Sequence, residues 1–484
     1  MISNTKILCI LILLSLSLNT IHVLAGDSDK KDSDEKDKDS DSDQKDKDSG
    51  SDSKEDSHSK KDSDESELFL ISCGSPEEVT DSEGRKWAPD SKFLACSDNS
   101  STAKADSIDP TIPSEEPYGS ARIFNTTSSY NLSVTTKKRL WIRLHFYPFS
   151  NDCLNQTRAY FSVVANEFTL LNNFSAATTA EALTEAYVVK EFSLTPVTSG
   201  KLNITITPSQ QPENTIAFLN GIEVIPMPDI FKTTPLVGFV DQTIEVQNSS
   251  VQTMYRLNIG GNFIPPTEDS EGGGNRTWHE DSGYLIGAPT TKFGITGEAN
   301  GNVTIKYPGD VPEYIAPLAV YNTGRSMGPS PNVNLNTNLT WHFDVDVNFT
   351  YVVRLHFCDF ELEMANQRVF DIFLNNHTAQ QGADVIGWAG SSAHGHGSSG
   401  QGIPVYKDYA IYVNDRNNGI EQVWVALHPN EEMKPEYYDS LLNGLEVFKI
   451  NDTCGNLGGQ NPVPVRHCYT NEFLTKKGDD ENSS

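Results

Sequence analysis

The stretch RLWIRLHFYPF (139–149) decides the fold class of this chain, and it has a close counterpart in YVVRLHFCDF (351–360). In RLWIRLHF the apolar residues Leu, Ile, Leu and Phe occupy every second position. Further short alternating runs, such as KLNITITP (201–208) and LTWHFDVDV (339–347), are separated by Gly, Pro and Asn. Period-two alternation between turn residues is typical of antiparallel strands in β-sandwiches. The sequence therefore predicts an all-β fold, with one short helical window at 175–187.

The chain repeats itself in the same order. FLNGIEVIPMP (218–228) resembles LLNGLEVFKIN (441–451), and GRKWAPDS (84–91) resembles NRTWHEDS (275–282). A shared order at a nearly constant offset indicates a duplicated domain. We therefore expect one domain at 68–228 and a second at 253–450, joined by a proline-containing junction at 229–252.

The two ends of the chain differ from this core in composition. An apolar run followed by HVLAG predicts a signal peptide at 1–25. Residues 26–67 are almost only Asp, Ser, Lys and Glu, which predicts a disordered tract because nothing apolar can be buried. Residues 451–484 are expected to form a C-terminal tail. With no later apolar span and no lipid-anchor signal, the expected product is secreted into the apoplast or cell wall.

Glycosylation sequons support an extracellular location. One N-x-S/T pattern means little, but many across a chain with a signal peptide predict a glycoprotein. The predicted acceptor residues are Asn99, Asn125, Asn131, Asn155, Asn173, Asn203, Asn248, Asn275, Asn302, Asn338, Asn348, Asn376, Asn451 and Asn482.

Charge and motifs exclude several classes of function. The formal net charge of −29 argues against nucleic acid, whose phosphates require a basic surface. No HRD or DFG segment of a protein kinase is present, so no kinase activity and no catalytic residue are predicted. HGHG (394–397) lacks a further ligand at a recognisable spacing, so no metal site and no cofactor are expected.

Longer motifs resemble the extracellular region of the FERONIA-type plant receptor kinases. They include YGSARIFN (118–125), YRLNIGGNFIPP (255–266), VYNTGRSMGP (320–329) and HPNEEMKPEYYDSLLNGLEVFKI (428–450). The resemblance implies tandem malectin-like domains. It also implies binding of small cysteine-rich peptides of the rapid alkalinization factor type, with a GPI-anchored LORELEI-like co-receptor. Family members continue into a membrane helix and a kinase, so the chain is interpreted as a soluble decoy or a truncated receptor kinase; in the truncated case the plasma membrane is its expected location.

The sequence is compatible with two kinds of ligand, a basic peptide and a carbohydrate. An acidic scaffold suits a basic peptide, and the stretch 268–275 offers Glu268, Asp269 and Glu271 as ligand-binding candidates. The loop FELEMANQ (360–367) is a second possible contact region. The alternative is a lectin-like protein that binds cell-wall pectin or another oligosaccharide by stacking on aromatic side chains. The aromatic candidates are Trp87, Trp278, Tyr284, Tyr321, Trp388, Tyr437 and Tyr438.

The cysteines outside the signal peptide generate a prediction about disulfides. Cys73 and Cys358 lie in apolar runs, whereas Cys96, Cys153, Cys454 and Cys468 lie in polar sequence. We expect a Cys454–Cys468 bridge, worth about 3 kcal/mol by loop-closure entropy, and a Cys96–Cys153 bridge. Non-reducing peptide mapping should recover both linked peptides; a free thiol at any of the four positions would contradict the assignment.

Overall fold

The computed structural model describes residues 68–95, 100–149, 154–269, 274–286, 295–299, 303–392, 400–416 and 419–463. Several sequence predictions lie outside these ranges. They are the signal peptide (1–25), the acidic tract (26–67), the HGHG motif, Glu271, Cys96, Cys153, Cys468 and the sequons at Asn99, Asn302 and Asn482.

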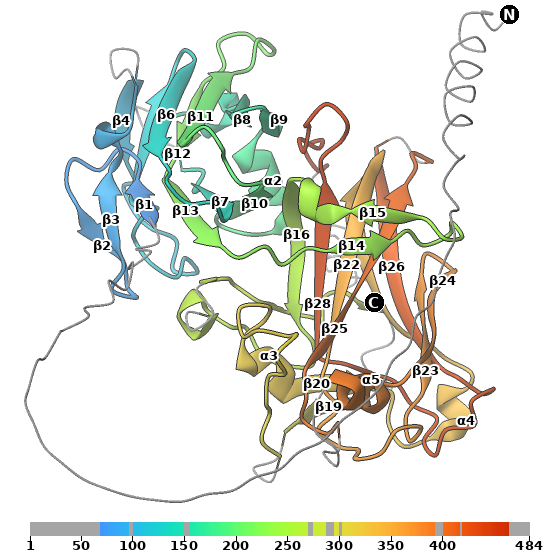
Figure 1. The fold of residues 1–484 in the computed structure, drawn as a ribbon. Coiled ribbons are helices and arrows are strands. Elements are labelled where there is room, and N and C mark those ends of the chain that lie inside the picture. The colour runs from blue at the N-terminus through green and yellow to red at the C-terminus, as the bar shows by residue number, and fades with distance from the viewer. Residues whose placement is uncertain are drawn as a thin grey trace, which may run out of the picture. The chain divides into compact units, whose positions relative to one another are not determined.

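An eleven-stranded sheet runs through both sequence repeats (Figure 1). Its order is β2 (Val79–Thr80), β3 (Lys86–Pro89), β1 (Phe69–Ser72), β13 (Gly221–Met227), β7 (Arg139–Phe146), β10 (Val188–Leu194), β16 (Val251–Asn258), β28 (Gly444–Ile450), β22 (Phe349–Phe357) and β25 (Val405–Val413), with β17 (His279–Glu280) paired to β16. The antiparallel pair β10–β16 joins the first half, residues 68–228, to the second half, residues 253–450.

Smaller sheets complete a sandwich in each half. In the first half they are β6 (Ser128–Ser133), β11 (Lys201–Pro208), β8 (Phe161–Ala165) and β9 (Phe168–Phe174), and separately β12 (Ala217–Leu219), β5 (Ser120–Phe124) and β4 (Ser100–Lys104). In the second half they are β18 (Leu285–Ile286), β21 (Leu339–Asp346), β26 (Ile420–Pro429), β23 (Phe370–Leu374) and β24 (His377–Ala383), and separately β19 (Ile295–Glu298), β20 (Thr323–Ser326) and β27 (Leu441–Leu442).

The remaining elements are short connections. They are the hairpin β14 (Thr233–Pro235) and β15 (Thr243–Glu245), the helices α2 (Ala176–Leu183), α3 (Leu318–Asn322), α4 (Pro331–Asn334) and α5 (Val385–Ser392), and the 3₁₀ turns η1 (Asp90–Lys92), η2 (Gln156–Arg158), η3 (Val246–Asn248) and η4 (Pro266–Asp269). Helix α2 falls in the helical window expected from sequence and is capped by Ser175, whose hydroxyl accepts from the Thr178 backbone N–H.

The alternation of RLWIRLHF divides β7 between two environments. Leu140, Ile142, Leu144 and Phe146 face the hydrophobic core of the first half, together with side chains of β8 and β11. The opposite face of β7 carries polar side chains that are nevertheless buried, among them Arg143 and His145. Strand β22 repeats this division with Arg354 and His356. Because side chains alternate along a strand, one face of β7 and one face of β22 each pack in the core of their own half, and the opposite face of each strand lies in a polar interior.

That polar interior contains the same ionic arrangement twice. Arg143 lies in register between Glu191 and Glu223. Its Nε donates to Glu191 at 2.6 Å and its Nη1 to Glu223 at 2.9 Å. The imidazole of His145 extends the arrangement. Its Nε2 lies 3.0 Å from the Glu223 carboxylate, and its Nδ1 lies 2.8 Å from the hydroxyl of Tyr118. Every charge here is therefore satisfied by a partner, as a buried charge requires.

In the second half Arg354 takes the place of Arg143. It lies in register between Asp408 and Glu446, and its Nη2 donates to Asp408 at 2.7 Å. His356 lies between Glu446, at 3.1 Å, and the hydroxyl of Tyr321, at 3.0 Å. Asn220 and Asn443 also repeat: each amide binds backbone carbonyls beside its own central strand. The duplication expected from sequence thus reappears as duplicated interior chemistry.

Arg256 of β16 connects the two ionic arrangements. Its Nη2 donates to Glu191 of the first half at 2.8 Å, and its Nε donates to Glu446 of the second half at 2.7 Å. Burial raises the pKa of Glu446, but Arg256, His356 and Arg354 together outweigh burial and hold that pKa at about 2. The pKa of Glu191 is likewise held below its usual range, against burial, by Arg256 and Arg143. The β10–β16 pairing therefore rests on a shared, buried guanidinium.

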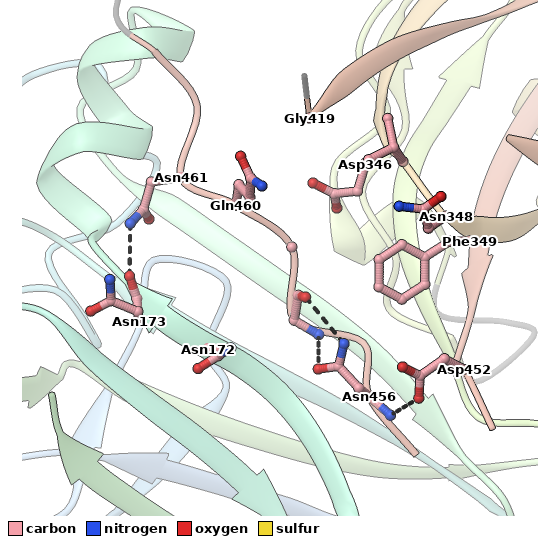
Figure 2. Close-up of a pocket in the computed structure, with 13 residues that line it drawn as sticks. Asn172, Asn173, Asp346, Asn348, Phe349, Gly419, Asp452, Asn456, Gln460 and Asn461 are labelled. Carbon is pink, nitrogen blue, oxygen red and sulfur yellow. Dashed lines mark hydrogen bonds between the residues drawn. The ribbon is translucent and has the colours of Figure 1, made fainter. Parts of the chain in front are cut away.

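Residues 451–463 return to the first half instead of leaving the fold. Thr169 of β9 and Asn456 form a parallel bridge, and Leu457 is completely buried in the core of the first half. Asn461 donates from its side-chain amide to the carbonyl of Asn173 (Figure 2). Its side-chain oxygen accepts from the Ser175 N–H. This part of the segment assigned to the tail is therefore a structural strap between the halves.

We predict that Arg256→Met destabilises the protein strongly. The change leaves Glu191 and Glu446 with one cationic partner fewer in the interior, and losing one member of a buried pair costs about 3–5 kcal/mol. Urea denaturation followed by circular dichroism measures the change. Arg416→Met, at an exposed position, is the matched control and should shift stability by less than about 0.5 kcal/mol. Equal stability of the two variants would contradict the shared role of Arg256.

We also predict that acid destabilises the fold in two stages. Burial lowers the pKa of His356, so protonation of the unfolded chain opposes folding below about pH 6.5. Glu223 and Glu446 have pKa values of about 2 in the fold against an ordinary 4.5, so their contribution is present above about pH 4.5 and is lost as the pH falls towards 2. Denaturation measured across pH should show both stages, and His356→Gln should flatten the upper one. A flat profile between about pH 7 and 4 would refute this.

Candidate functional site

The structure separates the three acidic residues proposed from sequence. Glu268 is exposed, and Glu271 lies outside the described ranges. Asp269 is buried, with 1% of its surface exposed, and accepts two hydrogen bonds from the guanidinium of Arg276, at 2.6 and 2.9 Å. The expectation that Asp269 binds a ligand therefore needs correction, because its carboxylate already neutralises a buried arginine.

The aromatic candidates for sugar stacking are mostly interior. Trp87, Trp278 and Tyr321 have no exposed surface, so their ring faces are closed to a ligand. The indole of Trp278 packs edge-on against the ring of His356. Tyr284, Trp388 and Tyr438 are half-buried, and Tyr437 is 46% exposed. Only Tyr437 among these seven candidates therefore presents a largely open ring.

A cavity of about 460 Å³ lies beside the strap at 451–463 (Figure 2). Its lining is rich in amides and carboxylates, including Asp346, Asp452 and Gln460. Two sequon residues, Asn173 and Asn348, stand on its wall, and Phe349 is its only aromatic residue. A glycan on either asparagine would compete with a ligand for this space, so the cavity is a poor candidate for a recognition site.

Two loops at one end of the second half build a different kind of surface. The loop between β22 and β23 contributes Glu361, Glu363 and Met364, and the loop between β26 and β27 contributes Glu431, Glu432, Met433, Glu436 and Tyr437; all eight are exposed. We call these eight residues the acidic methionine surface. Met364 is 61% and Met433 55% exposed.

Hydrogen bonds hold the two loops together. The Gln367 amide donates to the Glu436 carboxylate at 3.0 Å, and the Gln367 carbonyl accepts from the Tyr437 N–H at 2.8 Å. The Gln367 Oε1 also accepts from the backbone N–H groups of Glu363 and Met364. One glutamine side chain thereby fixes both loops, although they are separated by about sixty residues in sequence.

The buried side chain of Arg368 supports the acidic methionine surface. Its guanidinium donates to Asp359 at 2.7 Å, to Asp439 at 3.0 Å and to Glu361 at 2.5 Å. Burial raises the pKa of Asp439, and Arg368 opposes that rise. Of the five glutamates on the surface, Glu361 alone shares this arginine, while Lys434 is an exposed cation in the same loop. The surface therefore keeps a net negative charge over a rigid base.

No sequon falls within 360–367 or 428–438. Eleven sequon asparagines are among the described residues, and none of them is buried. Eight are exposed, and Asn203, Asn275 and Asn451 are half-buried. Neither loop therefore carries a glycan acceptor of its own, and Asn338 follows Thr337, whose carbonyl lies 3.0 Å from the ring of His428. Exposed methionines, which adapt their shape to a partner, are frequent at protein-binding surfaces.

Two observations on the described residues concern other classes of site. Among them, no helix is long and apolar enough to span a membrane. The same residues hold no group of three or more His, Cys, Asp or Glu side chains placed to bind a metal ion. Cys454 is exposed and forms no disulfide within the described residues, so its predicted bridge to Cys468 stays a prediction. Cys73 and Cys358 are buried thiols.

A family model for the malectin-like domain matches residues 71–450. The chain belongs to the malectin-like family. It is 46% identical over 416 residues to the receptor-like protein kinase FERONIA of Arabidopsis thaliana, covering 84% of this chain and 44% of FERONIA. It thus spans less than half the length of the curated relatives it matches. The all-β, tandem malectin-like fold and the resemblance to FERONIA-type ectodomains are confirmed.

Solved structures agree with this family. The crystal structure of the ANX1 ectodomain from Arabidopsis thaliana matches at a TM-score of 0.76 and 47% identity, covering 82% of this chain and 99% of that chain. A structure of the plant peptide RALF23 in complex with FER and LLG2 matches at a TM-score of 0.71 and 44% identity, covering 82% of this chain and 99% of that chain. The matched region of this chain thus corresponds to the ectodomains of those receptor kinases.

Proposed function

We propose that this malectin-like chain is an extracellular receptor-like protein that captures a small, basic, cysteine-rich signalling peptide of the rapid alkalinization factor type. The observation that carries the proposal is the acidic methionine surface: five glutamates around two exposed methionines and a tyrosine, on loops without a sequon. The relative FER is seen with the peptide RALF23 and with LLG2, which supports both a peptide ligand and a LORELEI-like, GPI-anchored co-receptor.

The chemistry of the surface fits a cationic, partly apolar peptide. Carboxylates on exposed loops raise the rate of encounter with a basic partner and act mainly through long-range attraction. Met364, Met433 and Tyr437 then offer apolar area for the contact that slows dissociation. Because Arg368 and Gln367 already order the loops, little conformational entropy is lost on binding.

Binding is the whole of the proposed activity, and the chain is proposed to have no catalytic role. We further propose a secreted location in the cell wall, where the chain would act as a soluble decoy or as the truncated ectodomain of a receptor kinase. Cell-wall pectin is a weaker candidate for the ligand, because a polyanion would be repelled by the same glutamates.

The test replaces Glu431, Glu432 and Glu436 by Gln and measures binding of RALF23 by surface plasmon resonance at several salt concentrations. We expect the association rate to fall roughly tenfold at low salt and its salt dependence to flatten, because exposed charges act mainly on encounter. The matched control replaces Glu77, Glu181 and Glu213, three exposed glutamates of the first half, and should bind like the unaltered protein.

A second variant separates apolar contact from charge. Met433→Ala should raise the dissociation rate severalfold with an unchanged association rate, since its side chain adds contact area without charge. Absence of RALF23 binding at micromolar concentration, or equal binding by the glutamate variant, would overturn the proposed surface. Binding of an oligogalacturonide in place of the peptide would establish the lectin function instead.

A further inference from the structure

A second exposed aromatic group lies away from the acidic methionine surface, beside the far end of β24. Trp424 of β26 is 44% exposed and Tyr412 of β25 is 42% exposed. Both line a hollow of about 490 Å³, whose remaining walls carry carboxylates and amides, including Asp344, Asn414 and Glu421. The volume is that of a small-ligand pocket, and its aromatic and polar lining suits a sugar.

Trp424 is exceptional among the tryptophans of the chain. Of the six, Trp87, Trp141, Trp278 and Trp341 are completely buried, and Trp388 is half-buried. The Trp424 indole N–H donates to the Gln422 side chain at 3.2 Å, and the Gln422 amide donates to Asp344 at 2.8 Å. The ring is therefore held in place by hydrogen bonds while much of its surface is exposed to water.

A sequon stands on the wall of this hollow. Asn375 and Asn376 form the two-residue turn between β23 and β24, both with positive φ (46° and 66°), as a type I′ hairpin requires. The Asn375 side-chain oxygen accepts from the backbone N–H of Trp424 at 2.6 Å and so fastens the turn to β26. Asn376, followed by His377 and Thr378, is exposed and lines the hollow together with Trp424.

We propose that the first sugars of an N-glycan on Asn376 occupy this hollow and pack against Trp424 and Tyr412. The apolar C–H face of an N-acetylglucosamine ring matches the electron-rich face of an indole. Its hydroxyl and acetamide groups match the carboxylates and amides of Asp344, Glu421 and Asn414. Covalent attachment at the wall gives this sugar a far higher effective concentration than any free saccharide.

The hollow that holds the proposed glycan lies apart from the acidic methionine surface of the second half. Strand β24 begins at His377, beside the hollow, and reaches Gln381, whose amide donates to Glu432 of the acidic methionine surface at 3.4 Å. At about 3.4 Å per residue the two ends lie about 14 Å apart along the strand. Packing against Trp424 and Tyr412 therefore keeps the first sugars of the glycan away from the proposed peptide-binding surface.

The test uses the protein secreted from human cells. Glycopeptide mass spectrometry should find Asn376 occupied. Thr378→Ala removes the sequon but keeps Asn376 and Trp424, and Thr378 is an exposed strand residue. Acrylamide quenching of tryptophan fluorescence should roughly double in this variant, because a stacked sugar covers one of the two indole faces. Trp424→Phe in the Thr378→Ala background should abolish the gain, which assigns it to this ring.

Ser133→Ala, which removes the distant sequon at Asn131, is the matched control and should leave the quenching unchanged. Enzymatic removal of the glycans from the folded, unaltered protein should reproduce the gain, so the test does not depend on the variant folding. A bare Asn376 in the secreted protein, or equal quenching with and without its glycan, would overturn the proposal.

Discussion

The carboxylate of Glu191 accepts hydrogen bonds from two guanidinium groups, that of Arg143 in the first half and that of Arg256 in the second. The rest of the structure depends on this arrangement, because the backbone pairing between β10 and β16 covers only three residue pairs. A buried carboxylate without its cations is far more costly than a few lost backbone bonds. The two halves therefore cannot separate without parting Glu191 from one of its two cations.

The same constraint reaches the interior of the second half. Arg256 also binds Glu446, Glu446 binds His356, and His356 binds Tyr321. Leu457 and Asn461 of the C-terminal strap then fasten the chain back onto the first half. The result is a scaffold whose strands are fixed on both sides, and loops attached to such a scaffold inherit its rigidity. A recognition surface on these loops needs little ordering when a ligand arrives.

Charge counting along the sequence identified an acidic protein but did not show which of its carboxylates are buried. EDSEGGGN (268–275) has a dense run of acids, yet Asp269 turns inward because Arg276, seven residues later, needs a buried partner. FELEMANQ (360–367) was also considered, and the structure places it beside a second acidic loop with which it forms one surface. Local sequence cannot show which carboxylate is paired, since the partner is set by tertiary contacts.

What the sequence by itself determined was local: the alternation that makes β7 and β22 two-faced, the Ser175-capped helix, the exposed sequons and the paired Arg, His and Asn positions of the two repeats. These follow from side-chain periodicity and turn chemistry, which act over a few residues. Only the tertiary structure decided that Arg256 is shared between the halves, that residues 360–367 and 428–438 meet, and that Trp424 lies beside Asn376. Such contacts join residues about fifty to two hundred positions apart, and their energy exists only after the strands have paired.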